Sequence, residues 1–222
     1  MSHQGEILDR RDFGLIETLL WTRDGGFDLL AEHLARLAVS STALGFPFDE
    51  AAVRAALAGA VAASPDARLR VRLVSHVDGA LETGATPIDP VPGGALWKVV
   101  LARRRFSSSD PLLRHKTTRR DLFEGELAEA AGRDGADEVL FLNERGEVCE
   151  GARCNVFLAR GGGLLTPPVS CGLLPGTLRA RLIASGRARE EILRLENFSA
   201  PAEFYLGNSV RGLVRAALID GD

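Results

Sequence analysis

The stretch Leu113-Arg-His-Lys-Thr-Thr-Arg119 places one lysine, Lys116, in a run of basic and hydroxyl residues that follows a serine-rich segment. On composition alone, such a run is typical of a solvated, basic helix start. A nucleic-acid surface would need a basic face with interleaved aromatic residues, which this short run lacks. A catalytic lysine is a third alternative, because Arg114 and Arg119 would lower the pKa of Lys116 and keep its amine nucleophilic. The stretch alone leaves these alternatives open.

The residues before this stretch predict an α/β lobe. Apolar spacing and turn signals predict two helices, at 30–44 and 50–62, and three strands, at 13–21, 68–76 and 95–102. Gly45 should end the first helix and Asp49 should cap the second. In the strand at 68–76, leucine and valine alternate with arginine, which is typical of a half-exposed strand. We expect an N-terminal lobe over 1–105 and a serine-rich linker over 106–112.

The residues after the linker predict a second lobe over 113–222. The expected helices lie at about 118–131 and 177–185, and the expected strands at 138–142, 154–159, 164–166, 203–206 and 213–219. Many strands lie too close together for helical crossovers, so much of the sheet should be antiparallel. The sequence therefore predicts a two-lobed α/β (α+β) fold with mixed or antiparallel sheets and flanking helices.

Composition excludes several functional classes. The chain has 222 residues, a net charge of -3 and 45% hydrophobic residues, which is ordinary for a globular protein and gives no general attraction to nucleic acid. We see no apolar run long enough to span a bilayer and no apolar signal core at the start, so we expect a cytoplasmic protein without membrane contact. The three cysteines match neither a disulfide framework nor a common zinc spacing, and we expect no metal.

Three further motifs each have two interpretations. Glu150 ends a predicted hairpin arm and is either a turn residue or a carboxylate that protonates a heterocyclic nitrogen. The segment 164–179 leads through a rigid loop into a helix start at Thr177, which is either an ordinary capped helix or an anion cradle. The segment 206–212, with small polar residues between two apolar strands, is either a turn or a second phosphate contact.

Taken together and in this order, the motifs resemble those of the fold-type IV pyridoxal-phosphate enzymes, also called class IV aminotransferases, which include the D-amino-acid aminotransferases. The resemblance covers nearly the whole chain. Its motifs are His33-Leu-Ala-Arg36-Leu, Lys116, Glu150-Gly with Asn155-Val-Phe, Gly172-Leu-Leu-Pro-Gly-Thr-x-Arg179, and Asn208-Ser209. Within the family, His115-Lys-Thr-Thr-Arg and Gly207-Asn-Ser-Val-Arg-Gly212 most resemble the 4-amino-4-deoxychorismate lyases.

The resemblance implies a pyridoxal 5'-phosphate cofactor and a role for each matching residue. Lys116 would bond to the cofactor and later act as acid and base, and Glu150 would face the ring nitrogen. The phosphate would be bound by one group of residues: Arg36, Thr177, Leu178, Asn208 and Ser209. We expect His33 to be a packing or capping group rather than a base.

For a lyase, the resemblance implies conversion of 4-amino-4-deoxychorismate to 4-aminobenzoate and pyruvate in folate biosynthesis. Thr18 aligns with a hydroxyl that relatives use near protonation of the leaving group, and Arg211 and Arg119 are candidates for binding the substrate carboxylates. The family also implies a homodimer and a functional link to an aminodeoxychorismate synthase. One alternative is an aminotransferase that acts on branched-chain or D-amino acids with 2-oxoglutarate. Another is a degenerate member that binds no cofactor and serves as a partner subunit.

Overall fold

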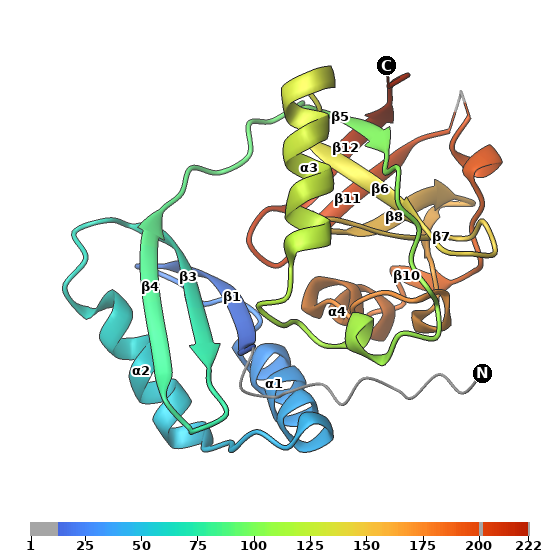
Figure 1. Cartoon of the computed structure of the whole chain (residues 1–222). Coiled ribbons are helices and arrows are strands. Elements are labelled where there is room, and N and C mark those ends of the chain that lie inside the picture. The colour runs from blue at the N-terminus through green and yellow to red at the C-terminus, as the bar shows by residue number, and fades with distance from the viewer. Residues whose placement is uncertain (1–12, 200–201, 222) are drawn as a thin grey trace, which may run out of the picture.

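The computed structural model describes residues 13–199 and 202–221, which form two lobes (Figure 1). The first lobe, residues 13–87, has a four-stranded sheet with two helices packed on it. The second lobe, residues 96–221, has an eight-stranded sheet with helices beside it. This agrees with the predicted two-lobed α/β (α+β) class.

The first lobe is an antiparallel sheet in the order β2-β1-β3-β4. Its elements are β1 (Leu15–Thr22), β2 (Gly26–Phe27), α1 (Leu30–Leu44), α2 (Glu50–Ala62), β3 (Arg68–Ser75) and β4 (Leu81–Pro87). The predicted caps are confirmed, because the Asp49 carboxylate accepts hydrogen bonds from the first amides of α2 and Gly45 ends α1 with a φ of 71°.

The alternation in β3 gives the first sheet two different faces. Leu69, Val71 and Leu73 are buried in the core beneath α1 and α2. The arginines that alternate with them, Arg68, Arg70 and Arg72, project from the opposite face, where Arg68 donates a hydrogen bond to the carbonyl of Val210 in the second lobe. Because strand side chains alternate, one face of this sheet packs the first core and the other faces the second lobe.

The second sheet has the order β10-β9-β8-β11-β12-β5-β6-β7, and β8 also pairs with β7. Its strands are β5 (Leu96–Leu101), β6 (Glu138–Leu142), β7 (Val148–Gly151), β8 (Asn155–Arg160), β9 (Gly163–Thr166), β10 (Ala188–Glu190), β11 (Phe204–Asn208) and β12 (Gly212–Leu218). Its helices are η2 (Pro111–Arg114), α3 (Asp121–Asp134), η3 (Val169–Cys171), α4 (Thr177–Ala184) and η4 (Leu195–Phe198). Most pairs are antiparallel, as predicted, whereas β5 pairs in parallel with β12 and β6, and β9 pairs in parallel with β10.

The boundary between the lobes differs from the prediction. Strand β5 was assigned to the first lobe (1–105), but it pairs with β12 and β6 and belongs to the second sheet, so residues 88–95 connect the two sheets. Residues 106–112 do not act as the linker, because Phe106 is buried and forms a β-bridge with Asn143. A serine-rich surface segment that packs along a sheet has the same composition as a linker, which explains the error.

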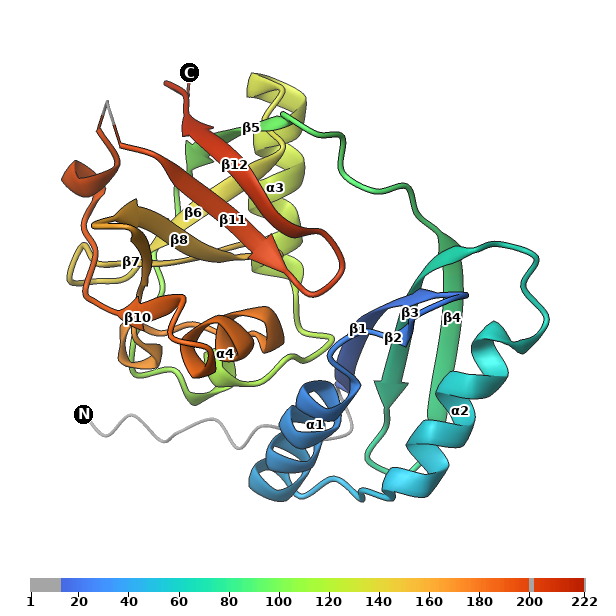
Figure 2. The ribbon, with the colours of Figure 1, turned by 180° about the vertical axis from the view of Figure 1, so that it is seen from behind.

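A second crossing between the lobes follows η2. Here Leu15 and Thr117 form a β-bridge, and the amide of Thr118 donates to the carbonyl of Gly14 at 2.9 Å. Helix α3 therefore begins at Asp121, later than predicted, because the preceding residues lie beside β1. Figure 2, the view from behind, shows the turn between β11 and β12 reaching toward the first sheet. The boundary between the lobes is thus held by several chain segments.

Candidate functional site

A cavity of about 720 Å³ lies between the lobes and is lined by residues of both. The structure brings all ten residues that the sequence singled out to its wall: Thr18, Arg36, Lys116, Arg119, Glu150, Thr177, Leu178, Asn208, Ser209 and Arg211. They come from β1, α1, the segment after η2, β7, α4 and the turn between β11 and β12. Segments that are distant in the sequence therefore meet at one site.

Lys116 lies on the extended segment beside β1, where its carbonyl accepts a hydrogen bond from the amide of Ile16 at 2.7 Å. The side chain of its neighbour His115 turns to α1, where Nδ1 lies 2.9 Å from the hydroxyl of Ser40. Burial, followed by the charges of Arg120 and Arg36, lowers the pKa of Lys116 from 10.5 to about 7. A substantial share of the amine is therefore neutral and nucleophilic near neutral pH.

Glu150 lies near the end of β7, directly opposite Asn155 of β8. Its carboxylate accepts a hydrogen bond from the amide of Leu174 at 3.2 Å. Burial raises the pKa of Glu150 to about 8, against the opposing effects of this hydrogen bond and of the cations Arg120 and Lys116. A buried carboxyl group of this kind would bind a protonated heterocyclic nitrogen well, because a cationic partner offsets the cost of ionising it.

The start of α4 forms a close-packed cradle. Gly176 precedes the helix, and a Cβ atom at this position would lie only 1.9 Å from Oδ1 of Asn155. Asn155 in turn donates from Nδ2 to the carbonyl of Leu174 at 2.9 Å, which fixes the loop. The amides of Thr177 and Leu178 belong to the first turn and so lack an acceptor within the helix. This helix start can therefore bind an anion.

Arg36 extends from α1 to this cradle and is bound to a residue that the motif analysis did not single out. Its guanidinium donates to the carboxylate of Glu17, with Nε 3.0 Å from Oε1 and Nη2 2.6 Å from Oε2. Burial disfavours the ionised form of Glu17, but Arg36 and the hydrogen bond from His33 outweigh it and lower the pKa to about 2. The signal was present in the sequence, because Glu17 is a charged residue within an apolar strand.

The side chain of Asn208 stabilises the turn between β11 and β12 by hydrogen bonds. Its Oδ1 accepts hydrogen bonds from the amides of Val210 and Arg211, at 3.0 and 2.9 Å, and its Nδ2 donates to Arg153 and Cys154. The adjacent Ser209 donates from its hydroxyl to the carbonyl of Thr18 at 3.2 Å. In this arrangement Asn208 shapes the turn, and its predicted contact with phosphate stays a prediction.

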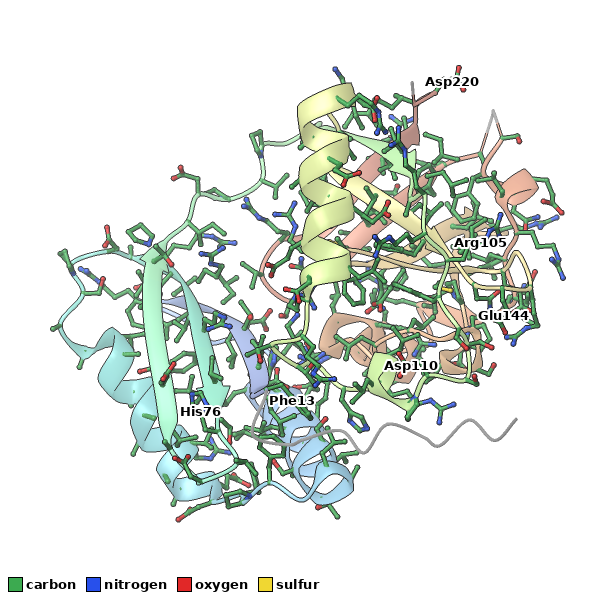
Figure 3. All side chains as sticks on the ribbon, in the orientation of Figure 1. Phe13, His76, Arg105, Asp110, Glu144 and Asp220 are labelled. Carbon is green, nitrogen blue, oxygen red and sulfur yellow. The ribbon has the colours of Figure 1, made fainter. Side chains whose placement is uncertain are left out.

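Cations dominate the wall of the cavity. Among the described residues, the cavity is lined by three carboxyl groups, Asp110, Glu124 and Glu150, and by eight arginines, Arg36, Arg70, Arg72, Arg105, Arg119, Arg120, Arg153 and Arg211. The guanidinium of Arg119 lies 5.4 Å from the ring centre of Phe13, a residue of the first lobe that Figure 3 labels close to α1. Arg70 and Arg72 were not predicted as site residues. The alternation along β3 shows which face of the sheet these side chains lie on, but it does not show what that face contacts. The wall favours a ligand with several negative charges.

Comparison with known proteins agrees with this geometry. The family model of amino-transferase class IV matches residues 14–219. A protein of Schizosaccharomyces pombe provisionally named aminodeoxychorismate lyase is 29% identical, with 92% of this chain and 89% of that protein covered. The bifunctional aminodeoxychorismate lyase / D-amino acid transaminase of Mycobacterium tuberculosis is also 29% identical, with coverage of 99% and 86%.

Solved structures are similar over nearly the whole chain. One from Mesorhizobium loti, provisionally named an amino-acid aminotransferase, has a TM-score of 0.88 and 41% identity, and the match covers 94% of this chain and 100% of that one. The PLP-bound form of a hypothetical aminotransferase from Mycobacterium tuberculosis has a TM-score of 0.79 and 26% identity, with coverage of 100% and 86%. With the match of the family model, these findings show that the chain belongs to the class IV aminotransferases, a family of pyridoxal-phosphate-dependent enzymes of fold-type IV.

Proposed function

We propose that this protein is a pyridoxal-phosphate-dependent 4-amino-4-deoxychorismate lyase, which releases 4-aminobenzoate and pyruvate. The observation that supports the proposal is the composition of the cavity between the lobes. The Lys116 amine with its lowered pKa, the buried carboxyl group of Glu150 and the start of α4, which can bind an anion, all line this cavity, and many of the other lining residues are arginines. The substrate carries carboxylates, and such a wall would attract and orient it.

The donor set fits pyridoxal phosphate. Arg36, the first amides of α4 and the hydroxyl of Thr177 would bind the phosphate. Glu150 would face the ring nitrogen, and Lys116 would bond to the aldehyde carbon. The cavity volume of about 720 Å³ is within the range of cofactor sites. When bound, the cofactor supplies an electron sink for cleavage next to the substrate amine.

The protein's own residues would then bind the substrate and move its protons. The amine of Lys116, released by the substrate, would remove the proton from the amine-bearing carbon. Loss of this proton allows the C–O bond to the enolpyruvyl group to break and the ring to become aromatic. The departing group becomes pyruvate when its methylene carbon is protonated, and Thr18 is the hydroxyl residue of β1 that lines the cavity for this step. Arg211 and Arg119 would bind the carboxylates.

A transamination function is the second candidate, and a specific observation favours it. The Mesorhizobium loti structure, at 41% identity, is named as an aminotransferase, and the Mycobacterium tuberculosis relative is named for both activities. An aminotransferase begins with the same proton removal and would use Lys116 and Glu150 in the same roles. The arginine-rich wall would also bind the two carboxylates of 2-oxoglutarate.

The deciding experiment measures release of 4-aminobenzoate and pyruvate from aminodeoxychorismate, which is generated in place from chorismate and glutamine by a synthase. Release that is lost in Lys116→Ala supports the lyase, and turnover retained by that variant refutes the role of Lys116. No release from protein that binds pyridoxal phosphate would favour the aminotransferase, to be tested with branched-chain and D-amino acids and 2-oxoglutarate. A protein that gains no visible absorbance with pyridoxal phosphate would instead be a degenerate member.

We further propose that the protein acts as a cytoplasmic homodimer and is linked in function to an aminodeoxychorismate synthase. The support for this proposal is membership of the family, and sedimentation of the protein alone and mixed with a synthase tests it. Within residues 13–199 and 202–221, the structure contains no helix that is both long and apolar enough to cross a membrane.

A further inference from the structure

Four side chains form one hydrogen-bonded chain that crosses the boundary between the lobes. Arg36 of α1 donates to Glu17 of β1, and Oε2 of Glu17 lies 2.5 Å from Nδ1 of His33, which is also on α1. Nε2 of His33 lies 3.2 Å from the hydroxyl of Thr177, the first residue of α4. Glu17, His33 and Thr177 are all buried. This chain ends at the helix start that would bind the cofactor phosphate.

The direction of the last hydrogen bond depends on the protonation of His33. Glu17 is ionised because its pKa is about 2, so its carboxylate accepts and Nδ1 of His33 donates. When His33 is neutral, Nε2 carries no hydrogen and the hydroxyl of Thr177 must donate to it. When His33 is protonated, Nε2 donates instead, and the hydrogen of the Thr177 hydroxyl becomes available to another acceptor.

A bound phosphate changes this balance, because its oxygens are acceptors and need donors. Thr177 lines the cavity and has one hydroxyl hydrogen. That hydrogen cannot be donated both to a neutral His33 and to a phosphate. Phosphate binding with a hydrogen bond from Thr177 therefore favours the protonated form of His33.

The surrounding charges act in the same direction. The charged groups around His33 are Glu17 from β1, Arg36 and Glu32 from its own helix, and Arg181 from α4, which binds Glu32 at 2.8 Å. Glu17 contacts both Arg36 and His33, and Glu32 pairs with Arg181. The charges of Glu17, Arg36, Glu32 and Arg181 cancel, so protonation of His33 leaves the cluster with one net positive charge in the empty cradle. A phosphate ester brings a charge of about −1.5 to −2 near neutral pH, which offsets this positive charge.

We infer that His33 takes up a proton from solvent when a phosphate group binds at α4, and that this proton turns the Thr177 hydroxyl from His33 to the phosphate. His33 is thus a positioning residue that acts through Thr177. The inference rests on the proposed cofactor site, because it assumes that the phosphate of pyridoxal phosphate occupies the cradle. It links the affinity for the cofactor to pH through a residue that does not take part in the chemistry.

The test uses the full chain freed of cofactor and 4'-deoxypyridoxine 5'-phosphate, a probe that lacks the aldehyde and cannot bond to Lys116. Nitrogen-15 NMR of labelled histidine reports the protonation of each ring, and the chain has four histidines, so His33→Gln identifies the signal of His33. At the same pH, a larger fraction of His33 should be protonated in the complex than in the free protein. Over the pH range in which the two forms differ, the affinity for the probe should fall as the pH rises, by up to about tenfold per pH unit more than in His33→Gln.

Variants at Thr177 provide the matched control on an unchanged His33. Thr177→Ser keeps the hydroxyl and should retain the change at His33, whereas Thr177→Val lacks it and should lose the change. A His33 signal that shows the same protonation in free and probe-bound protein overturns the inference and leaves the proposed cofactor site intact. If the probe does not bind at all, both the inference and the proposed function are overturned.

Discussion

Replacing Lys116 by methionine should stabilise the cofactor-free protein near neutral pH, and the gain should shrink as the pH rises. In the folded protein, burial and the charges of Arg120 and Arg36 lower the pKa of Lys116 from 10.5 to about 7. The unfolded chain keeps this amine protonated up to its ordinary pKa. Between these two values the unfolded state binds more protons, so the stability of the wild type rises with pH. Methionine has no such titration.

The expected size follows from the pKa. One proton contributes about 1.36 kcal/mol per pH unit, and the two states differ by half a proton to nearly one proton between pH 7 and pH 9. The resulting change in the free energy of unfolding is about 2 kcal/mol. Lys116 is partly accessible from the cavity, so water screens its charge. We therefore expect about 1 kcal/mol of change in the difference between wild type and variant.

Urea unfolding of both cofactor-free proteins at several values between pH 7 and pH 9 measures this difference. Subtracting the two curves removes every group that titrates equally in both proteins. Lys98, an exposed lysine of β5, gives the control, and Lys98→Met should show no such trend with pH. A constant difference between the wild type and Lys116→Met would show that the amine is not held in the neutral form, and the argument for a nucleophilic lysine would fail.

Three further changes test the rest of the site. Glu150→Gln should leave folding intact and slow turnover by roughly tenfold or more, because the ring nitrogen loses its carboxylate; an unchanged kcat would mean that the nitrogen has another partner. Arg36→Leu should raise the dissociation constant of pyridoxal phosphate by about 10-fold to 150-fold, since a charge-assisted hydrogen bond contributes about 1.5–3 kcal/mol, and an equilibrium titration that shows no change refutes this role. Gly176→Ala places a Cβ atom 1.9 Å from Oδ1 of Asn155 and should weaken cofactor binding by displacing the start of α4. In the same titration, Gly59→Ala, on an exposed part of α2 where a Cβ atom meets nothing within 4 Å, should bind normally, and equal affinities of the two alanine variants would contradict the geometry.

The parts of the fold that local sequence determines were predicted well. Helix α2 begins and ends where Asp49 and the apolar spacing indicated, and α1 ends before Gly45 as expected. Strand β4 was not predicted, because it is an exposed edge strand of polar and small residues that lacks an apolar alternation. The boundary between the lobes was misplaced because the pairing of β5 with β12 is a long-range contact, which no local pattern records.

The candidate site shows the same division. Motif order found residues from six segments that meet at one cavity, although each motif alone was ambiguous. Glu17 was passed over because it lies inside a strand identified by its apolar neighbours, and its partners His33 and Arg36 are on another element. Arg70 and Arg72 were recognised as one face of a strand, but only the packing of the lobes shows that this face lines the cavity.

The hydrogen bond between His33 and Thr177 has a consequence for engineering this protein. The residues proposed to bind the phosphate include Arg36 from the first lobe and the first amides of α4 from the second, so neither lobe alone contains the whole proposed phosphate site. A chimaera that joins the first lobe of this protein to the second lobe of a relative, or the reverse, would combine two parts of the site that come from different proteins. In such a chimaera, loss of cofactor retention is expected before loss of folding, because each lobe keeps its own hydrophobic core. Grafts should therefore transfer Glu17, His33, Arg36 and Thr177 as one unit.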